Sequence, residues 1–156
     1  MNSFFNILRN LLKKNFFSVM IKKIFKRYEK NTSIEARQWA ISKVKISTKD
    51  YLKNLDPKLF EETTYAINKI EKDAKKKLLT INFSLGGPGN YMLLYFLIRK
   101  FKPKIVVETG VAAGWSSLSI LRALNKNGIG KLYSSDFPYF RLKNPENYVG
   151  FLANNE

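Results

Sequence analysis

The feature that most constrains the fold is the stretch I-V-V-E-T-G-V-A-A-G, residues 105–114. Three apolar residues lead to Glu108, two glycines four residues apart follow, and an amphipathic helical pattern begins near Ser116. This order predicts a buried strand that turns through Gly110 and Gly114 into a helix. At such a turn the unpaired N–H groups of the helix lie beside a carboxylate, and small charged ligands bind in that setting.

A second strand is expected shortly after this helix. The helical pattern runs from Ser116 to about Asn125 and closes at Asn127-Gly128, residue types that tolerate the left-handed conformation. Residues 131–135 then have the pattern of a short strand that ends at Asp136. Strand, helix and strand within about 30 residues make a βαβ unit, with parallel strands and a right-handed crossover. The predicted fold class is therefore α/β, with N-terminal helices followed by this unit.

Composition excludes several kinds of chemistry. The 156 residues include neither Cys nor His, which removes disulfides, zinc–thiolate sites, Cys nucleophiles and His-based catalysis. No metal site is expected, and any proton transfer would have to use carboxylates, Lys or Tyr. We divide the chain into a basic amphipathic helical arm (1–30), a helical region (31–102) and the α/β unit (103–156).

The formal net charge of +16 raises the question of an anionic partner. Lys supplies 22 of the 28 basic residues, and the chain is also rich in Asn, Ile and Phe, a mixture that A/T-rich codons would produce. Nucleic acid is therefore not the partner we favour. No stretch has the roughly 20 uncharged apolar residues of a membrane span, and the N-terminus does not resemble a signal peptide. We expect a cytoplasmic location, with the arm as the part that would contact a membrane surface.

Residues 1–30 show two apolar stripes on a basic background. Helical spacing places the second stripe roughly opposite the first, so a break is expected between Asn15 and Ser18. Two interpretations stay open: the arm binds an anionic membrane surface, or it is a pair of helices packed on the domain or on a partner chain. The stripes consist of Phe4, Phe5, Ile7, Leu8, Leu11 and Leu12, and of Met20, Ile21, Ile24, Phe25 and Tyr28.

The region 31–102 is expected to be mostly helical. A helix from Ile34 to about Val44 would use Trp39 and Ile41 as apolar anchors, and residues 46–55 would add a short helical turn. Asp56-Pro57 marks the start of a helix that runs to about Leu79, with a capping carboxylate followed by Pro at the first helical position. Its buried stripe would consist of Leu59, Phe60, Thr63, Ile67, Ile70, Ala74 and Leu78.

A loop is predicted at residues 84–90, which contain three glycines and a proline. It is either a flexible segment that folds over a ligand or a plain connector. The next eleven residues, Tyr91 to Phe101, are apolar nearly all round, which indicates a helix buried on several sides. Pro103 ends it.

Two families of ligand use a βαβ unit of this kind. Dinucleotide-binding domains need G-x-G-x-x-G, in which the last glycine lets the helix pack closely on the strand. Aligned on Gly110, this chain has Ala112 at the second glycine and Trp115 at the third. A bulky Trp115 conflicts with that packing, so an NAD-linked oxidoreductase is the less favoured interpretation.

The pattern E-x-G-x-x-x-G followed by an aromatic residue and Ser resembles motif I of class I S-adenosylmethionine-dependent methyltransferases. The similarity is greatest to the small-molecule O-methyltransferase branch that includes catechol O-methyltransferase, and it covers roughly Gly86 to Tyr139. The resemblance implies that residues 103–156 form a partial Rossmann-like cofactor-binding unit. It also implies methyl transfer from S-adenosylmethionine to a small-molecule acceptor that the sequence does not identify.

The resemblance assigns a role to each matching residue. Glu108 would face the methionine amine, and Ser116 would hydrogen-bond the methionine carboxylate at the helix N-terminus. Gly110 and Gly114 would let the backbone approach the cofactor, and Asp136 would accept hydrogen bonds from the ribose hydroxyls. Each residue also has a simpler structural explanation. The carboxylate would compensate the helix dipole, the glycines would serve the turn, the serine would cap the helix, and the aspartate would end a strand.

The family pattern is not complete in this chain. A methyltransferase of this class has a seven-stranded sheet, whereas two strands precede residue 137 and Pro145 to Ala153 would add only a short helix. We therefore expect the N-terminal portion of a methyltransferase, a fragment with half a cofactor site and no catalytic residue that can be named. Its partner would be a missing C-terminal half or another subunit. The main alternative is a non-enzymatic basic module that binds anionic membrane or nucleic acid.

Overall fold

The computed structural model describes residues 2–13, 16–26 and 33–154, and these form two compact units. One unit combines Met1–Ser47 with Tyr139–Pro145. The other combines Thr48–Pro138 with Glu146–Glu156 and contains the predicted cofactor turn. None of the helices among the described residues is both long and apolar enough to cross a membrane.

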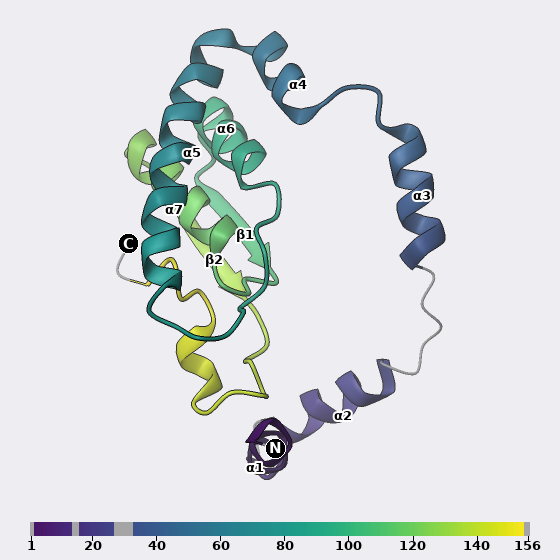
Figure 1. Ribbon diagram of the computed structural model, residues 1–156. Coiled ribbons are helices and arrows are strands. Elements are labelled where there is room, and N and C mark those ends of the chain that lie inside the picture. The colour runs from purple at the N-terminus through teal and green to yellow at the C-terminus, as the bar shows by residue number, and fades with distance from the viewer. Residues whose placement is uncertain (1, 14–15, 27–32, 155–156) are drawn as a thin grey trace. The chain divides into compact units, whose positions relative to one another are not determined.

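The larger unit is a helical layer with a small parallel sheet (Figure 1). Its helices are α4 (Thr48–Leu55), α5 (Pro57–Leu78), α6 (Tyr91–Phe101) and α7 (Trp115–Asn127). The strands are β1 (Ile105–Thr109) and β2 (Lys131–Ser135), and a short 3-10 helix, η1 (Pro145–Tyr148), lies near the C-terminus. The coarse α/β prediction is confirmed: β1 and β2 pair in parallel, with Ile105 opposite Lys131 and Thr109 opposite Ser135.

Local sequence signals set the helix ends. Asp56 caps α5, and its Oδ1 accepts a hydrogen bond from the N–H of Leu59 at 3.1 Å. Gly128 ends α7 in the left-handed conformation, with φ of 69°. Asn90 caps α6 through its side chain, which accepts from the N–H of Leu93. The predicted loop therefore ends at the cap of the next helix, while Leu85 within it is buried.

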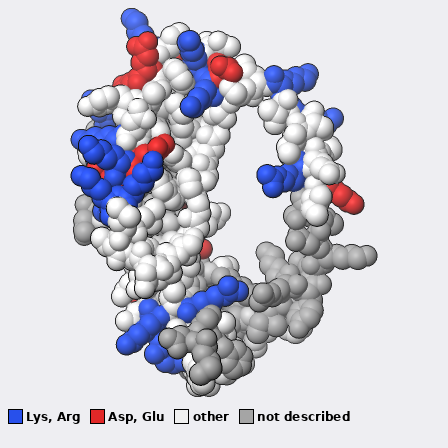
Figure 2. All heavy atoms as spheres, in the orientation of Figure 1, with Lys and Arg blue, Asp and Glu red and all other residues white. Residues whose placement is uncertain are grey.

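The core of this unit lies between α5, α6 and α7. Phe96 of α6 and Leu118 of α7 are almost completely buried, as is the Ala74 face of α5. Of the stripe predicted for α5, Thr63, Ile67, Ile70 and Ala74 are buried, whereas Leu59, Phe60 and Leu78 are half-buried. Lysines follow on the last turn of α5, where positive charge complements the helix dipole, and Figure 2 shows Lys and Arg side chains gathered over this helix.

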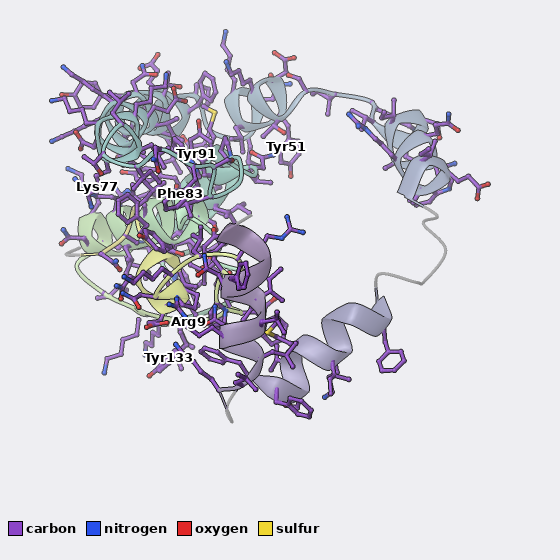
Figure 3. The ribbon with its side chains drawn as sticks, turned by 60° about the horizontal axis from the view of Figure 1, so that its bottom comes forward. Arg9, Tyr51, Lys77, Phe83, Tyr91 and Tyr133 are labelled. Atoms are coloured by element: carbon purple, nitrogen blue, oxygen red, sulfur yellow. The ribbon has the colours of Figure 1, made fainter. Side chains whose placement is uncertain are left out.

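The prediction of a buried strand at residues 105–109 is wrong for one of its faces. Val106 is half-buried and Glu108, which hydrogen-bonds Ser117 of α7, is buried, but Ile105 and Val107 are 66% and 72% exposed. Tyr133, the register partner of Val107, is 57% exposed, and Figure 3 shows it on the opposite side of this unit from Lys77 of α5 and Tyr91 of α6. The apolar run predicted burial on both faces, whereas the described helices cover only one.

The smaller unit contains α1 (Asn2–Leu11), α2 (Phe17–Lys26) and α3 (Ser33–Lys43). The arm does break, but earlier than the predicted interval from Asn15 to Ser18: α1 ends at Leu11, and α2 begins at Phe17, so Ser18 is already helical. Asn15 itself lies outside the described residues. The prediction that Trp39 and Ile41 anchor α3 in a core is wrong, because these residues are 67% and 63% exposed. Their apolar character predicted burial, but α3 has no described core to pack into.

Candidate functional site

The predicted site is built around Glu108, near the carboxyl end of β1. Its side chain is only 9% exposed. Oε2 accepts hydrogen bonds from the hydroxyls of Ser117, at 2.6 Å, and Ser134, at 2.9 Å. Ser134 is the register partner of Glu108 on β2, and Ser117 lies in the first turn of α7. The βαβ unit thus brings both donors to one carboxylate oxygen.

The second carboxylate oxygen of Glu108 has a different environment. Oε1 is buried and has no hydrogen-bond partner among the described residues. Leaving a buried acceptor unpaired costs about 1–3 kcal/mol, more when the group is charged. Such an atom in a folded protein calls for a specific explanation, and a bound donor group is one.

The N-terminus of α7 begins directly after the turn. Its N-cap residue is Gly114, which has no side chain to accept hydrogen bonds from the first N–H groups of the helix. Ser116, the second helical residue, is half-buried, and its hydroxyl makes no hydrogen bond among the described residues. Backbone donors at a helix N-terminus favour an anion. Donors for an anion and an acceptor for a cation therefore flank the same turn.

Asp136 is tied to the turn by its own carboxylate. Oδ2 accepts from the N–H of Ala112, and Oδ1 accepts from the N–H of Phe137 at 2.6 Å. The strand pairing extends past Thr109, since the N–H of Gly110 donates to the carbonyl of Ser135 at 2.9 Å. The structure therefore places Asp136 beside the glycine turn. Each of its oxygens keeps a second lone pair for a ligand.

The two glycines of the turn differ in their surroundings. Both have left-handed backbones, with φ of +81° at Gly110 and +91° at Gly114. A β-carbon at Gly110 would meet no atom within 4 Å, whereas one at Gly114 would lie 2.9 Å from the Cα atom of Gly150. The missing side chain of Gly114 thus makes room for protein backbone; its predicted approach to a cofactor stays a prediction.

The segment around Gly150 is a neighbour of the turn that sequence reasoning missed. The N–H of Gly150 donates to the carbonyl of Ala112, and the N–H of Leu152 donates to that of Ala113, both at 2.9 Å. Lys77 of α5, labelled in Figure 3, donates to the carbonyl of Leu152 at 2.8 Å. These bonds satisfy two carbonyls of the turn and hold the segment against it. No short-range sequence pattern predicts a contact between this segment and the turn.

Trp115 anchors the start of α7. It is 8% exposed and packs against Tyr91 of α6, with ring centroids 5.4 Å apart. The hydroxyl of Ser119 donates to the carbonyl of Tyr91 at 2.7 Å. The Tyr91 hydroxyl (Figure 3) donates to Glu71 at 2.5 Å; burial, and then this hydrogen bond, raise the pKa of Tyr91 to about 12. α6 and α7 are therefore fixed to each other next to the turn.

All the residues predicted for the site belong to one local arrangement. Glu108, Gly110, Gly114 and Ser116 follow one another through the β1–α7 connection, and Asp136 joins them from the end of β2. Sequence reasoning missed Ser117 and Ser134 as partners of the carboxylate. Ser134 could have been predicted from the sequence, because the parallel register places that residue opposite Glu108.

No protein-family model matches the sequence, and neither a curated protein nor a solved structure shows a significant similarity to it.

Proposed function

We propose that the β1–α7 turn binds S-adenosylmethionine and that the chain forms part of an enzyme that transfers its methyl group to a small molecule. The observation that carries this proposal is the unpaired, buried Oε1 of Glu108 beside an α7 N-terminus that no side chain caps. The methionine end of the cofactor carries an ammonium and a carboxylate. These two charges match the acceptor and the donors that flank the turn.

The residues of the turn fit the rest of the cofactor less completely. Asp136 would accept from the ribose hydroxyls with the lone pairs that remain after its bonds to Ala112 and Phe137. Ser116 would donate to the methionine carboxylate, since its hydroxyl has no described partner. The buried Trp115 supports this cofactor over a dinucleotide, because it stands where the dinucleotide fingerprint needs a glycine.

The cofactor's sulfonium makes its methyl group electrophilic, and the chain's own residues would bind and orient it. Glu108, Ser116 and Asp136 would fix the two ends of the molecule, and Gly110 would keep the turn free of side chains. We assign no general base. In the proposed Rossmann-like enzyme, further α/β units would supply the acceptor pocket. The exposed face of the sheet, at Ile105, Val107 and Tyr133, supports this, since parallel sheets are normally covered on both faces.

Isothermal titration of the protein with S-adenosylmethionine tests this proposal. We expect binding by the unmodified chain and an affinity about tenfold to a hundredfold lower for Glu108→Gln, which keeps the shape and removes the charge. Glu61→Gln is the matched control, because Glu61 is exposed on α5. Binding that Glu108→Gln leaves unchanged, or no binding by the unmodified chain, would contradict the proposal.

A further inference from the structure

A buried polar side chain on α1 fixes how the helix is turned. Asn10 is completely buried, and its Nδ2 donates to the carbonyls of Phe140, at 3.0 Å, and Leu142, at 3.3 Å. Asn6, one turn earlier, donates to the carbonyl of Arg141 at 3.2 Å. Two side chains on one helical face thus hold the backbone of the 140–142 segment. The rotation of α1 within its own unit follows from these bonds.

With α1 turned in this way, three large apolar residues of the helix and of the turn that follows it are exposed, whereas Ile7 and Leu11 are half-buried. Leu12 is 85% exposed, Phe5 65% and Leu8 45%. At 100° per residue these three side chains fall within about 60° of one another around the helix. Arg9 (Figure 3) and Lys13 are exposed directly beside them, on the next part of the circumference. We name these five residues the α1 outer face: an apolar stripe with a basic border.

The following helix repeats the pattern. Phe17 and Phe25 of α2 are 52% and 71% exposed, and they lie with Ile21 at i, i+4 and i+8, which is one stripe of a helix. Met20 is buried, so α2 also has an inner side. Lys22 is exposed near the Phe25 edge. Each helix of the arm therefore exposes apolar side chains bordered by basic ones.

The charge of this segment is of one sign. Residues 1–28 contain seven basic residues and no Asp or Glu. The segment therefore contains no acidic side chain that could neutralise these charges. An apolar stripe bordered only by cations complements a surface that is both anionic and apolar. Nucleic acid would satisfy the charges and leave the exposed Leu and Phe side chains in water. The combination favours a lipid surface.

We propose that the α1 outer face docks on an anionic membrane, with Leu8 and Leu12 in the acyl–headgroup boundary and Arg9 and Lys13 on lipid phosphates. This goes beyond the proposed cofactor site and does not depend on it. An acceptor dissolved in, or located at, a membrane would be accessible to a chain bound in this way. The two Leu residues supply the apolar burial, and the two basic residues supply the dependence on lipid charge.

Vesicle co-sedimentation of the full chain tests the docking. The protein should pellet with vesicles of mixed phosphatidylcholine and phosphatidylserine and stay in solution with phosphatidylcholine alone. Leu8→Gln with Leu12→Gln should lower the partition coefficient about tenfold or more, because the insertion of two Leu side chains is lost. Arg9→Gln with Lys13→Gln should lower it by a similar factor and flatten its salt dependence. Ile34→Gln with Ile41→Gln, on the exposed face of α3, is the matched apolar control and should bind as the unmodified chain does.

Three results would overturn the proposal. The first is no difference between the two kinds of vesicle. The second combines two observations: the Leu8 and Leu12 variant binds vesicles as the unmodified chain does, and the Arg9 and Lys13 variant loses binding both to vesicles and to an RNA probe. That result would make the arm an electrostatic contact for nucleic acid. The third is loss of a dimer on size-exclusion chromatography in the Leu8 and Leu12 variant, which would assign the stripe to a second copy. Circular dichroism melts of each variant report whether it folds, and exposed positions should melt as the unmodified chain does.

Discussion

The backbone of Gly150 lies where a side chain of Gly114 would have to be. A β-carbon at Gly114 would stand 2.9 Å from the Cα atom of Gly150 and 3.1 Å from its carbonyl carbon. Two backbone hydrogen bonds, from Gly150 to Ala112 and from Leu152 to Ala113, hold this approach in place. The segment after η1 can therefore lie against the turn only while residue 114 is a glycine.

The two glycines of the turn should consequently respond differently to Ala. Gly110→Ala meets no neighbour and should cost about 1–2 kcal/mol for the left-handed backbone alone. Gly114→Ala carries the same cost and adds about 1–3 kcal/mol of overpacking against Gly150. Urea unfolding followed by circular dichroism measures both. Equal losses of unfolding free energy would mean that the Gly114–Gly150 contact contributes nothing.

Substitutions of the two adjacent serines at the start of α7 should affect different properties, one the stability of the fold and the other the binding of the cofactor. Ser117→Ala removes one of the two donors to the buried carboxylate of Glu108 and should lower the free energy of unfolding by about 1–3 kcal/mol. Ser116→Ala removes a hydroxyl with no described partner, so its effect on stability should stay within about 0.5 kcal/mol. Under the proposed function it should still weaken S-adenosylmethionine binding. Thermal melts and calorimetric titration of the two variants check this; a reversed order of stability would contradict the assignment of donors.

Asp136 should stabilise the turn in addition to any ligand contact. Asp136→Ala removes the acceptors of the Ala112 and Phe137 N–H groups and should cost about 1–3 kcal/mol of unfolding free energy. Asp136→Asn keeps one acceptor oxygen and should fall between that variant and the unmodified chain. Urea titration ranks the three. If Asp136→Asn were as unstable as Asp136→Ala, the hydrogen bonds would not be the source of the effect.

One ion pair should make stability depend on pH. The Arg99 guanidinium donates to both oxygens of Glu62, at 2.6 and 3.1 Å, and this hydrogen bonding holds the pKa of Glu62 below its usual value. A carboxyl whose pKa is lower in the folded state contributes stability that is present above its unfolded pKa, near 4.5, and is lost as the pH falls through the folded value.

The expected result is a smaller acid-induced loss of unfolding free energy in Glu62→Gln than in the unmodified chain. Glu61→Gln, at the neighbouring exposed position, should keep the unmodified slope. Urea unfolding at a series of pH values, from about 6 down to about 3, measures this. If the free energy of unfolding fell equally with pH in all three proteins, the Glu62–Arg99 pair would not stabilise the folded state.

Local signals were sufficient to predict most of the secondary structure. The pair Asp56-Pro57 marks the start of α5 and Asn127-Gly128 marks the end of α7, because capping depends on residues within one turn of the helix end. The βαβ unit was predictable for a related reason. A strand, a helix and a strand of these lengths leave only the parallel arrangement.

Features that depend on distant partners were not predictable. Trp39 and Ile41 are large and apolar, as residues that anchor a helix in a core usually are, but whether they are buried depends on what packs against α3. The contact between Gly114 and Gly150 joins residues 36 positions apart without any pattern in between. The orientation of α1 depends on the carbonyls of Phe140 and Leu142, which bind the buried Asn10 while the apolar Phe5 and Leu8 are exposed.

The central claim is that the amino-acid end of S-adenosylmethionine binds between Glu108 and the N-terminus of α7. The most direct test compares two ligands on two proteins: S-adenosylhomocysteine and methylthioadenosine, which lacks the amino acid, titrated into the unmodified chain and Glu108→Gln. The account predicts that Glu108→Gln weakens S-adenosylhomocysteine about tenfold to a hundredfold and leaves methylthioadenosine unchanged. Equal weakening of both ligands, or of neither, would contradict it.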